Sequence, residues 1–365
     1  MKPPHGQRIE HEKVSPPPTA SKAQTQSRSA VTTRYNDSVA AAAGGWRDQI
    51  VQTKPAAAWG AGCMSETDEL PPEFDPALYV AHPANTDLGG LGADQARHHY
   101  DLYGRAEGRY CSAVDGREAF LALIPTGGTV LYIDPFFAPG VELPNRTVRR
   151  LAARTTDELR EAARQAAIDP AAVPEIDLVW HGEPYRELTR ERFDAVLGLH
   201  SLERQPCLIT HLSDVASVLK PGARYFLAIA DRRFGAAHYL PDSLLPDALE
   251  AFAVRRTRHV ARNVIANRLM ATHDNAAAHW AGIHGPDPRR READNPLRQE
   301  SAALLRSLRS GTPDAVTPAW YFTPESFQYL IDTLAVLGLS PLRIERLYWT
   351  INPFSAFYCV LRVAA

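Results

Sequence analysis

The amino-acid sequence predicts an α/β fold: a doubly wound, mostly parallel sheet with an antiparallel C-terminal hairpin and an inserted helical lid. Two observations predict it. From residue 129 to residue 229, short apolar runs alternate with helical repeats, which favours right-handed crossovers between parallel strands. Near the C-terminus, the strand-like runs Leu342–Thr350 and Ala356–Val363 are joined by a connector too short for a parallel crossover, so we expect them to pair antiparallel.

The chain divides into three parts by composition. Residues 1–70 are rich in Pro, Ser, Thr, Gln and Ala and lack any sustained apolar period, which predicts a disordered tail. Residues 72–110 predict a small helical accessory segment, and residues 111–365 predict the α/β domain, with an insertion at about 234–319. Adjacent residues on a helix diverge by ~100°, so we interpret His98 and His99 as surface and capping side chains rather than as ligands of one ion.

The strand-like runs of the main domain are short, apolar and bounded by turn residues: Thr129–Ile133, Ile176–Trp180, Phe193–Leu199 and Tyr225–Ile229. A capping box of Thr155 and Glu158 predicts a helix start. Apolar residues at helical spacing follow the third run and end at Lys220-Pro221-Gly222, which we interpret as a turn. A last helix is predicted from Thr323, as N-cap, to Gly338.

Charge and apolar content exclude several classes of protein. The 40 Lys and Arg residues against 42 Asp and Glu give a net charge of -2, which disfavours nucleic acid as a partner. The longest strongly apolar run, Tyr225–Ala230, is far below the ~20 residues that span a bilayer. The first residues lack an apolar export signal, and the four Cys are widely separated. We therefore expect a soluble, cytoplasmic protein with reduced thiols and no membrane partner.

One stretch resembles a known superfamily. Phe193–Leu197, followed by His200-Ser201-Leu202-Glu203 and by Leu219-Lys220-Pro221-Gly222, is similar to the fourth-strand motifs of class I S-adenosylmethionine-dependent methyltransferases. The resemblance extends over residues 130–362, and Trp320–Phe327 is similar to one bacterial branch of that superfamily. It implies methyl transfer from S-adenosylmethionine to a small-molecule or carbohydrate-like acceptor.

The resemblance also implies a cofactor site, from which this chain departs. The implied cofactor-binding residues are Ile133, Asp134, Pro135, Phe136, Glu183 and Leu199. Asp134 replaces the first Gly of the family's loop and brings a negative charge beside the expected methionine carboxylate, unless a nearby Arg compensates. Tyr132 replaces an acid, and Ala152 lies near the place of the acid that would bind the ribose hydroxyls. Glu183 could still accept a hydrogen bond from the adenine amino group.

The resemblance further implies a set of catalytic and acceptor-binding residues. His200 is the candidate general base and Glu203 the residue that orients it or the acceptor. The implied acceptor-binding residues are Asp231, Arg233, His273, His279 and Trp280. Three of these have a structural alternative: a strand cap for His200, a helix-dipole acid for Glu203, and a surface ion pair with an N-cap for Asp231. The spacing of His273, His279, His284 and Asp274 does not match a compact zinc motif, so no metal is predicted.

Two hypotheses of function remain open. The first is an active methyltransferase. The second is a protein of the same fold whose cofactor loop has eroded at Tyr132, Asp134 and Ala152 and which acts as a binding or partner subunit. A nicotinamide-binding Rossmann enzyme is disfavoured by the absence of Gly-x-Gly-x-x-Gly and by the antiparallel final strand.

Overall fold

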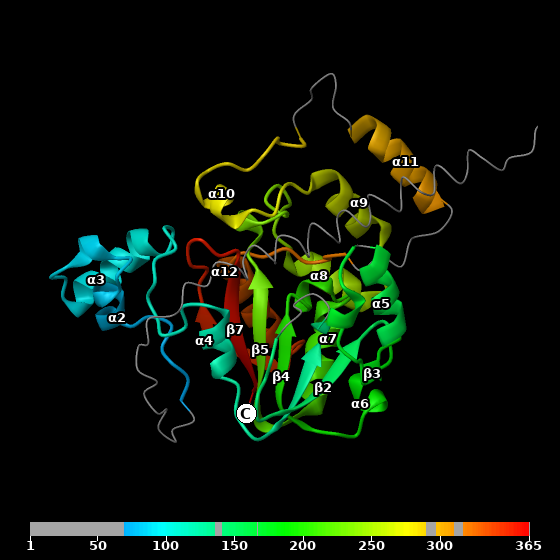
Figure 1. Cartoon of the computed structure of the whole chain (residues 1–365), viewed down its shortest axis with the longest axis horizontal. Coiled ribbons are helices and arrows are strands. Elements are labelled where there is room, and N and C mark those ends of the chain that lie inside the picture. Colours follow the sequence, from blue (N-terminus) through cyan, green and yellow to red (C-terminus); the bar gives the residue numbers. More distant parts are fainter. Residues whose placement is uncertain (1–68, 136–140, 166, 290–296, 310–316, 365) are drawn as a thin grey trace, which may run out of the picture.

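The computed structural model describes residues 69–135, 141–165, 167–289, 297–309 and 317–364. Nearly all of the predicted tail and the candidate cofactor residue Phe136 lie outside these residues. Within them, seven strands form one sheet in the order β3-β2-β1-β4-β5-β7-β6 (Figure 1). The strands are β1 (Thr129–Ile133), β2 (Thr147–Ala152), β3 (Leu178–Val179), β4 (Phe193–Leu199), β5 (Leu219–Ala230), β6 (Leu342–Tyr348) and β7 (Ala356–Val363).

The direction of the strands confirms the predicted fold class. The first five strands pair in parallel, whereas β7 pairs antiparallel with both β5 and β6. This is the arrangement that the sequence predicts from the short connector between the last two strands. The fold is a doubly wound α/β sheet, mostly parallel, that ends in an antiparallel hairpin.

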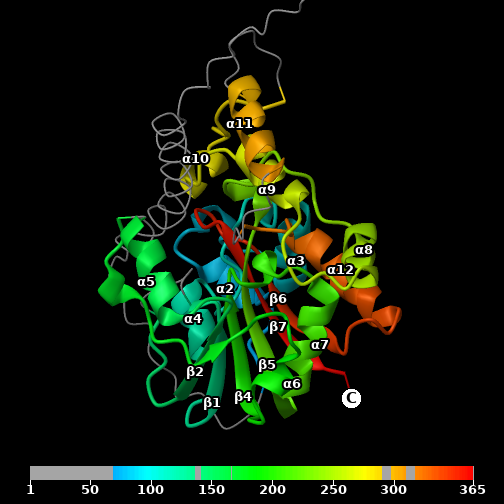
Figure 2. The same ribbon diagram turned by 90° about the vertical axis from the view of Figure 1, so that its right-hand side faces the viewer.

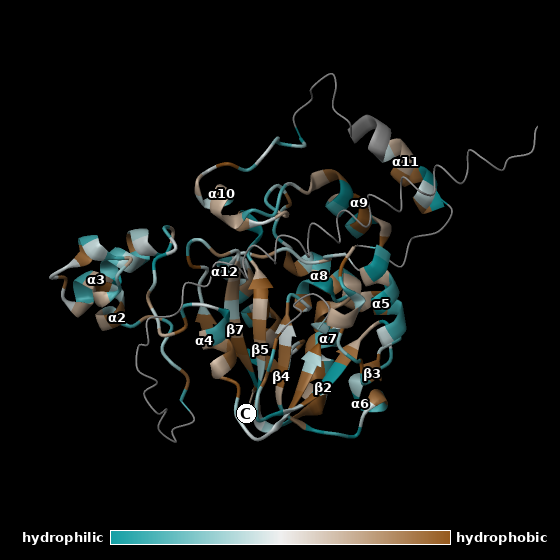
Figure 3. Ribbon diagram, in the orientation of Figure 1, coloured by the Kyte–Doolittle hydropathy of each residue, from teal (hydrophilic) through white to brown (hydrophobic). Residues whose placement is uncertain are grey.

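Helices cover both faces of the sheet, as Figure 2 shows from the side, with α4 and α5 on one face and α7 and α12 on the other. The helices of the sheet domain outside the insertion are α4 (Arg117–Ala122), α5 (Thr156–Gln165), α6 (Tyr185–Leu188), α7 (Leu208–Val218) and α12 (Pro324–Val336), with short turns η4 (Pro170–Ala172), η5 (Leu202–Arg204) and η6 (Arg232–Phe234). The central strand β5 is largely hydrophobic along its length, whereas β2 also carries hydrophilic residues (Figure 3).

Alternating side chains of the central strands feed two separate cores. Leu131 and Val196 pack with α7 and α12 on one face, and Val130 and Leu197 pack with Phe120 of α4 on the other. Strands buried on both faces read as continuous apolar runs. This explains why β1 and β4 have the bounds that the sequence predicts.

The segment Lys220-Pro221-Gly222 is not the turn that the sequence predicts. It belongs to β5, which begins at Leu219. The pairing with β4 jumps from Phe193–Leu219 to Ala195–Arg224, so the extra residues form a bulge. Gly222 takes a φ of 78°, which a residue with a side chain would adopt at a cost. Pro and Gly therefore mark an irregularity within a strand rather than its start.

Two predicted helix starts are confirmed. Thr155 and Glu158 form the capping box before α5, with the Thr155 N–H donating to Glu158 Oε2 over 2.8 Å. Thr323 caps α12 by accepting from the Ser326 N–H over 3.2 Å. Gly338, at a φ of 70°, follows the end of α12.

The segment before the sheet is helical. It contains α2 (Pro76–Ala81), η1 (Thr86–Leu88), α3 (Ala93–His99) and a π-helical turn η2 (Tyr100–Gly104). Phe74, Tyr79 and Tyr100 form its aromatic core. The segment joins the β6–β7 connection, where Asn352 N donates to Gly108 O over 2.9 Å. His99 Nδ1 lies 2.9 Å from the Tyr79 hydroxyl, and His98 is exposed.

The insertion lies above the carboxyl ends of the parallel strands (Figure 1). Its helices are α8 (Leu245–Ala253), α9 (Ala261–Met270), α10 (Ala276–Trp280) and α11 (Leu297–Arg309). Among the helices that the structure describes, none is both long and apolar enough to cross a bilayer.

Candidate functional site

Two neighbouring strands end in residues with unusual backbone geometry. Asp134 follows β1 with a φ of 51°, and His200 follows β4 with a φ of 53°. β1 and β4 pair in parallel, so both residues lie at the same edge of the sheet. A left-handed backbone at a residue with a side chain costs on the order of 1–3 kcal/mol, and such residues concentrate at functional sites.

The Asp134 carboxylate lies against the loop that follows β4. Gln205 Nε2 donates to Asp134 Oδ2 over 3.2 Å and to the Ser201 carbonyl over 3.0 Å. Burial raises the pKa of Asp134 to about 6, although the positive charge of Arg204 and the Gln205 hydrogen bond act in the opposite direction. Arg204 is therefore the nearby cation that could offset the charge of Asp134. Sequence reasoning placed neither Arg204 nor Gln205 at the cofactor site.

A small cavity opens between the loop after β3 and the start of α7. Its lining residues are Trp180, Gly182, Tyr185, Gln205, Pro206, Cys207, Thr210, His211, Asp214, Arg256 and Thr257. Glu183 follows the lining residue Gly182, and its Oε2 accepts from the His181 N–H over 2.9 Å. The Trp180 indole donates to the Glu183 carbonyl over 2.7 Å, which fixes this loop.

The end of β2 is apolar. Ala152 is buried against α5, and Tyr132, in the place of the family's acid, is buried on the same side of the sheet as Phe120. Ile133 and Leu199, two other candidate cofactor residues, are buried at the ends of β1 and β4, and Pro135 is buried after Asp134.

His200 and Glu203 lie together. His200 Nδ1 is 3.4 Å from Glu203 Oε1, and both side chains are buried. Glu203 Oε1 accepts from the Ala230 N–H at the end of β5 over 2.5 Å. Glu203 Oε2 is buried and has no hydrogen-bond partner among the described residues. The Glu203 carbonyl also accepts from Ala319 N over 2.6 Å, which ties the end of the insertion to this loop.

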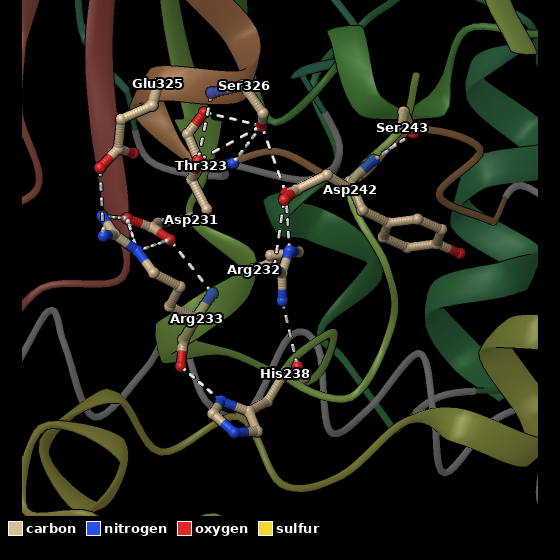
Figure 4. Close-up of polar contacts among 10 residues, drawn as sticks. Asp231, Arg232, Arg233, His238, Asp242, Ser243, Thr323, Glu325 and Ser326 are labelled. Atoms are coloured by element: carbon tan, nitrogen blue, oxygen red, sulfur yellow. Dashed lines mark hydrogen bonds and ion pairs between the residues drawn. The ribbon is translucent and has the colours of Figure 1, made fainter. Parts of the chain in front are cut away.

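Asp231 is the end point of a polar network (Figure 4). It is fully buried, and its Oδ2 accepts from Arg233 Nη2 over 2.6 Å and from Thr350 Oγ1 over 2.6 Å. Its Oδ1 accepts from the Arg233 N–H over 3.1 Å and caps η6. This geometry has the ion pair and the N-cap of the structural alternative, but Asp231 is buried, so the expected surface position of the pair is wrong. Arg232 pairs similarly with Asp242, with Nε 2.6 Å from Oδ1.

Two candidate acceptor residues of the insertion make local contacts. His273 Nε2 lies 3.1 Å from the Ile283 carbonyl, and its Nδ1 accepts from Asn275 N over 3.3 Å. Trp280 stacks on Phe234 with ring centroids 3.6 Å apart, and its indole donates to the Phe354 carbonyl over 2.9 Å. Trp280 thus joins the insertion to the β6–β7 connection.

Asp274 joins two parts of the insertion. It is partly buried, and its Oδ1 accepts from the Ala236 N–H over 3.2 Å. Burial raises the pKa of Asp274, while the hydrogen bond from the Ala236 N–H and the positive charge of Arg204 act to lower it. Asp274 and Asp134 are therefore both influenced by the charge of Arg204.

The third candidate of the insertion, His279, is buried within a cluster of histidines. Its Nδ1 lies 2.9 Å from His284 Nδ1, and the rings of His238 and His284 stack with centroids 3.8 Å apart. Burial is the main reason that the pKa of His279 falls to about 4. His238 comes from the loop after β5, far from the others in sequence, so histidine spacing alone gave no sign of it.

Comparisons with known proteins concern the fold. No protein-family model matches the chain, and no curated protein matches it. One similar solved structure, from Rhodobacter sphaeroides, is described as a Zn-dependent alcohol dehydrogenase (13% identity, 73% of this chain and 97% of that one, TM-score 0.35). A second is the CcbJ methyltransferase of Streptomyces caelestis (13% identity, 67% of this chain and 92% of that one, TM-score 0.32). A third is the glycopeptide N-methyltransferase MtfA (22% identity, 29% of this chain and 48% of that one, TM-score 0.22). At these TM-scores, the likenesses carry no information about substrate or cofactor.

Proposed function

We propose that this protein transfers a methyl group from S-adenosylmethionine to a small-molecule or carbohydrate-like acceptor. The observation that carries the proposal is the pair of left-handed residues, Asp134 and His200, at the carboxyl ends of β1 and β4. The chain order reverses at these two strands, because β2 lies on one side of β1 and β4 on the other. Ligands of open α/β sheets bind at such a point.

Two parts of the site fit the cofactor. Asp134 keeps the backbone conformation that a glycine adopts easily, as expected at the position of the first Gly of the resembled loop. Arg204 supplies a positive charge near Asp134, which offsets its repulsion of the methionine carboxylate. The cavity beside Gly182 and Trp180 lies where the adenine would be expected, but it is too small to hold the base as it stands, so the loop after β3 would have to move for adenine to enter.

One part fits less well. Ala152 offers no acceptor to the ribose hydroxyls at the end of β2, and unpaired buried hydroxyls cost about 1–3 kcal/mol. This observation favours the second candidate, a methyltransferase-fold protein that binds a partner or ligand without methyl transfer. The two candidates differ in whether the chain binds the cofactor at all.

The residues of this chain would position the acceptor and accept its proton. When bound, S-adenosylmethionine supplies an electrophilic methyl group on a sulfonium. His200, as general base, would take the proton from an acceptor hydroxyl or amine. Glu203 would act as a positioning residue, because its Oε1 is held by Ala230 N and lies near His200 Nδ1. The insertion would exclude water from this edge.

Isothermal titration of S-adenosylhomocysteine into the full chain tests the proposal. We expect saturable binding at micromolar ligand. Thr210 is exposed and lines the cavity, so Thr210→Phe should weaken binding at least tenfold. Ser213 is exposed on the same helix and does not line it, so Ser213→Phe is the matched control and should bind normally. A folded chain without detectable binding at millimolar ligand would overturn the proposal in favour of the second candidate.

A further inference from the structure

Three histidines from two distant segments meet above the sheet. We propose that His238, His279 and His284 form a binding site for one divalent transition-metal ion of the zinc class. One ring nitrogen of each residue lies within 4.8 Å of those of the other two. Four-coordinate zinc with nitrogen ligands at about 2.0–2.1 Å requires nitrogens about 3.3 Å apart. The rings would therefore have to shift, with His284 turning out of its stack on His238, before the three lone pairs converge on one ion.

The other ring nitrogens are already held by carbonyls. His279 Nε2 lies 3.0 Å from the His273 carbonyl, and His238 Nδ1 lies 2.8 Å from the Arg233 carbonyl. A carbonyl accepts only, so both nitrogens carry the proton. The lone pairs of His279 Nδ1 and His238 Nε2 are therefore free for a metal. Protein ligands of zinc commonly have this arrangement, in which the second ring nitrogen donates to a carbonyl that fixes the ring.

His284 completes the set. Its Nδ1 faces His279 Nδ1 over 2.9 Å, and because His279 Nδ1 is an acceptor, His284 donates this hydrogen bond. An ion between the two nitrogens would replace that shared proton, with His284 carrying its proton on Nε2 instead. Each ring stays neutral, as imidazole ligands must be.

The loop that carries His284 is held in place without the metal. Thr272 Oγ1 donates to the His284 carbonyl over 2.6 Å, and the Tyr239 hydroxyl donates to the Gly285 carbonyl over 2.7 Å. Gly285 has a φ of 75°, and a Cβ there would come within 2.7 Å of Thr272 Oγ1. His238 is fixed in the same way, because the Arg232 Nη1 donates to its carbonyl over 3.3 Å (Figure 4).

The donor set decides the class of ion. Three neutral imidazoles suit zinc, copper, nickel or cobalt, whereas magnesium and calcium prefer oxygen ligands. A three-histidine set leaves a fourth position for water or for an oxygen of a bound molecule. The inference concerns residues apart from the cavity proposed for adenine, so it stands or falls independently of cofactor binding.

Metal content of the full chain, purified without a polyhistidine tag, tests the inference. After incubation with zinc and desalting, we expect about one zinc per chain, and substitution with cobalt should give visible d–d absorption. His284→Ala and His238→Ala should each weaken zinc affinity at least tenfold, measured by competition with a chromophoric chelator. Both side chains are only partly buried, so both variants are expected to fold, and the buried His279 is left unchanged.

The matched control is His273→Gln. His273 touches the cluster, with its ring centroid 4.3 Å from that of His279, but lies outside the three-ligand set. Glutamine can keep the hydrogen bond to the Ile283 carbonyl, so zinc binding should be unchanged. Equal zinc affinity in the His238→Ala, His284→Ala double variant, or no zinc bound at micromolar metal, would overturn the inference. Titration with S-adenosylhomocysteine in the same samples separates this result from a failure of the proposed function.

Discussion

The side-chain amide of Gln205 donates a hydrogen bond to Oδ2 of Asp134 over 3.2 Å, across the carboxyl ends of β4 and β1. Gln205 is itself anchored by its second bond, to the Ser201 carbonyl. Asp134 is a departure from the pattern that this chain resembles, and the structure brings the positive charge of Arg204 near it. Arg204 therefore offsets part of the charge that Asp134 adds.

Removing the charge of Asp134 should tighten cofactor binding. Asp134→Asn keeps the size of the side chain and tolerates a left-handed backbone, and Asp134→Gly also removes the side chain. We expect both variants to bind S-adenosylhomocysteine about tenfold more tightly at pH 8 by isothermal titration. The gain should shrink at pH 5, where the wild-type carboxyl is largely protonated because its pKa is about 6.

The matched control for that comparison is Asp157→Asn. The Asp157 side chain is 95% exposed in the first turn of α5. Its substitution therefore removes one negative charge at a position away from the site. Its affinity should equal that of the wild type. Unchanged affinity in both Asp134 variants would show that this side chain does not face the ligand carboxylate.

Asp134 should also make stability depend on pH. Burial raises its pKa from 3.8 in the unfolded chain to about 6 in the folded protein, so the folded state binds the proton more tightly. The contribution of Asp134 to the free energy of unfolding should thus be greatest below pH 4 and should be lost as the pH rises through 6. Asp134→Asn should match the wild type at pH 4 and be more stable at pH 8 by on the order of 2 kcal/mol, in urea unfolding. Equal stability at both values would contradict the assignment.

The fold was predictable because its signals are local. The runs at 129–133 and 193–199 are buried on both faces, so hydrophobicity alone marks their bounds. The connector between β6 and β7 determines their direction by its length. The turn predicted at Lys220-Pro221-Gly222 was wrong because Pro and Gly usually end helices and strands, whereas here they form a bulge within β5.

The site was less predictable because its contacts are distant in sequence. His200 and Glu203 are neighbours on one loop and could be paired from their spacing. His238 could not be joined to His279, since only the folding of the insertion brings the loop after β5 against α10. Asp231 was placed correctly at the end of β5, but the pattern could not reveal that Thr350 and Arg233 occupy its oxygens.

Glu203 should be sensitive to the loss of its acceptor oxygen more than to the loss of its charge. Glu203→Gln keeps an oxygen for the Ala230 N–H, whereas Glu203→Ala leaves that amide without its partner. We expect Glu203→Ala to lower the free energy of unfolding by about 1–3 kcal/mol and Glu203→Gln to lower it by less than 1 kcal/mol, in urea unfolding. If Glu203→Ala and Glu203→Gln are equally stable and both lose only methyl transfer, the predicted role of Glu203 in stability is wrong.

Asp231 and Arg233 should be coupled energetically, because the Asp side chain is fully buried while its oxygens accept from the Arg guanidinium. We expect Asp231→Asn to cost about 3 kcal/mol of stability and a double-mutant cycle with Arg233→Met to give a coupling of at least 1 kcal/mol. Asp287 and Arg289 have the same spacing and a similar ion pair, but Arg289 is 62% exposed. Asp287→Asn should therefore cost less than about 1 kcal/mol. Equal costs at the two pairs would mean that burial of Asp231 does not strengthen its contact, and Asp231 would then be free to bind an acceptor.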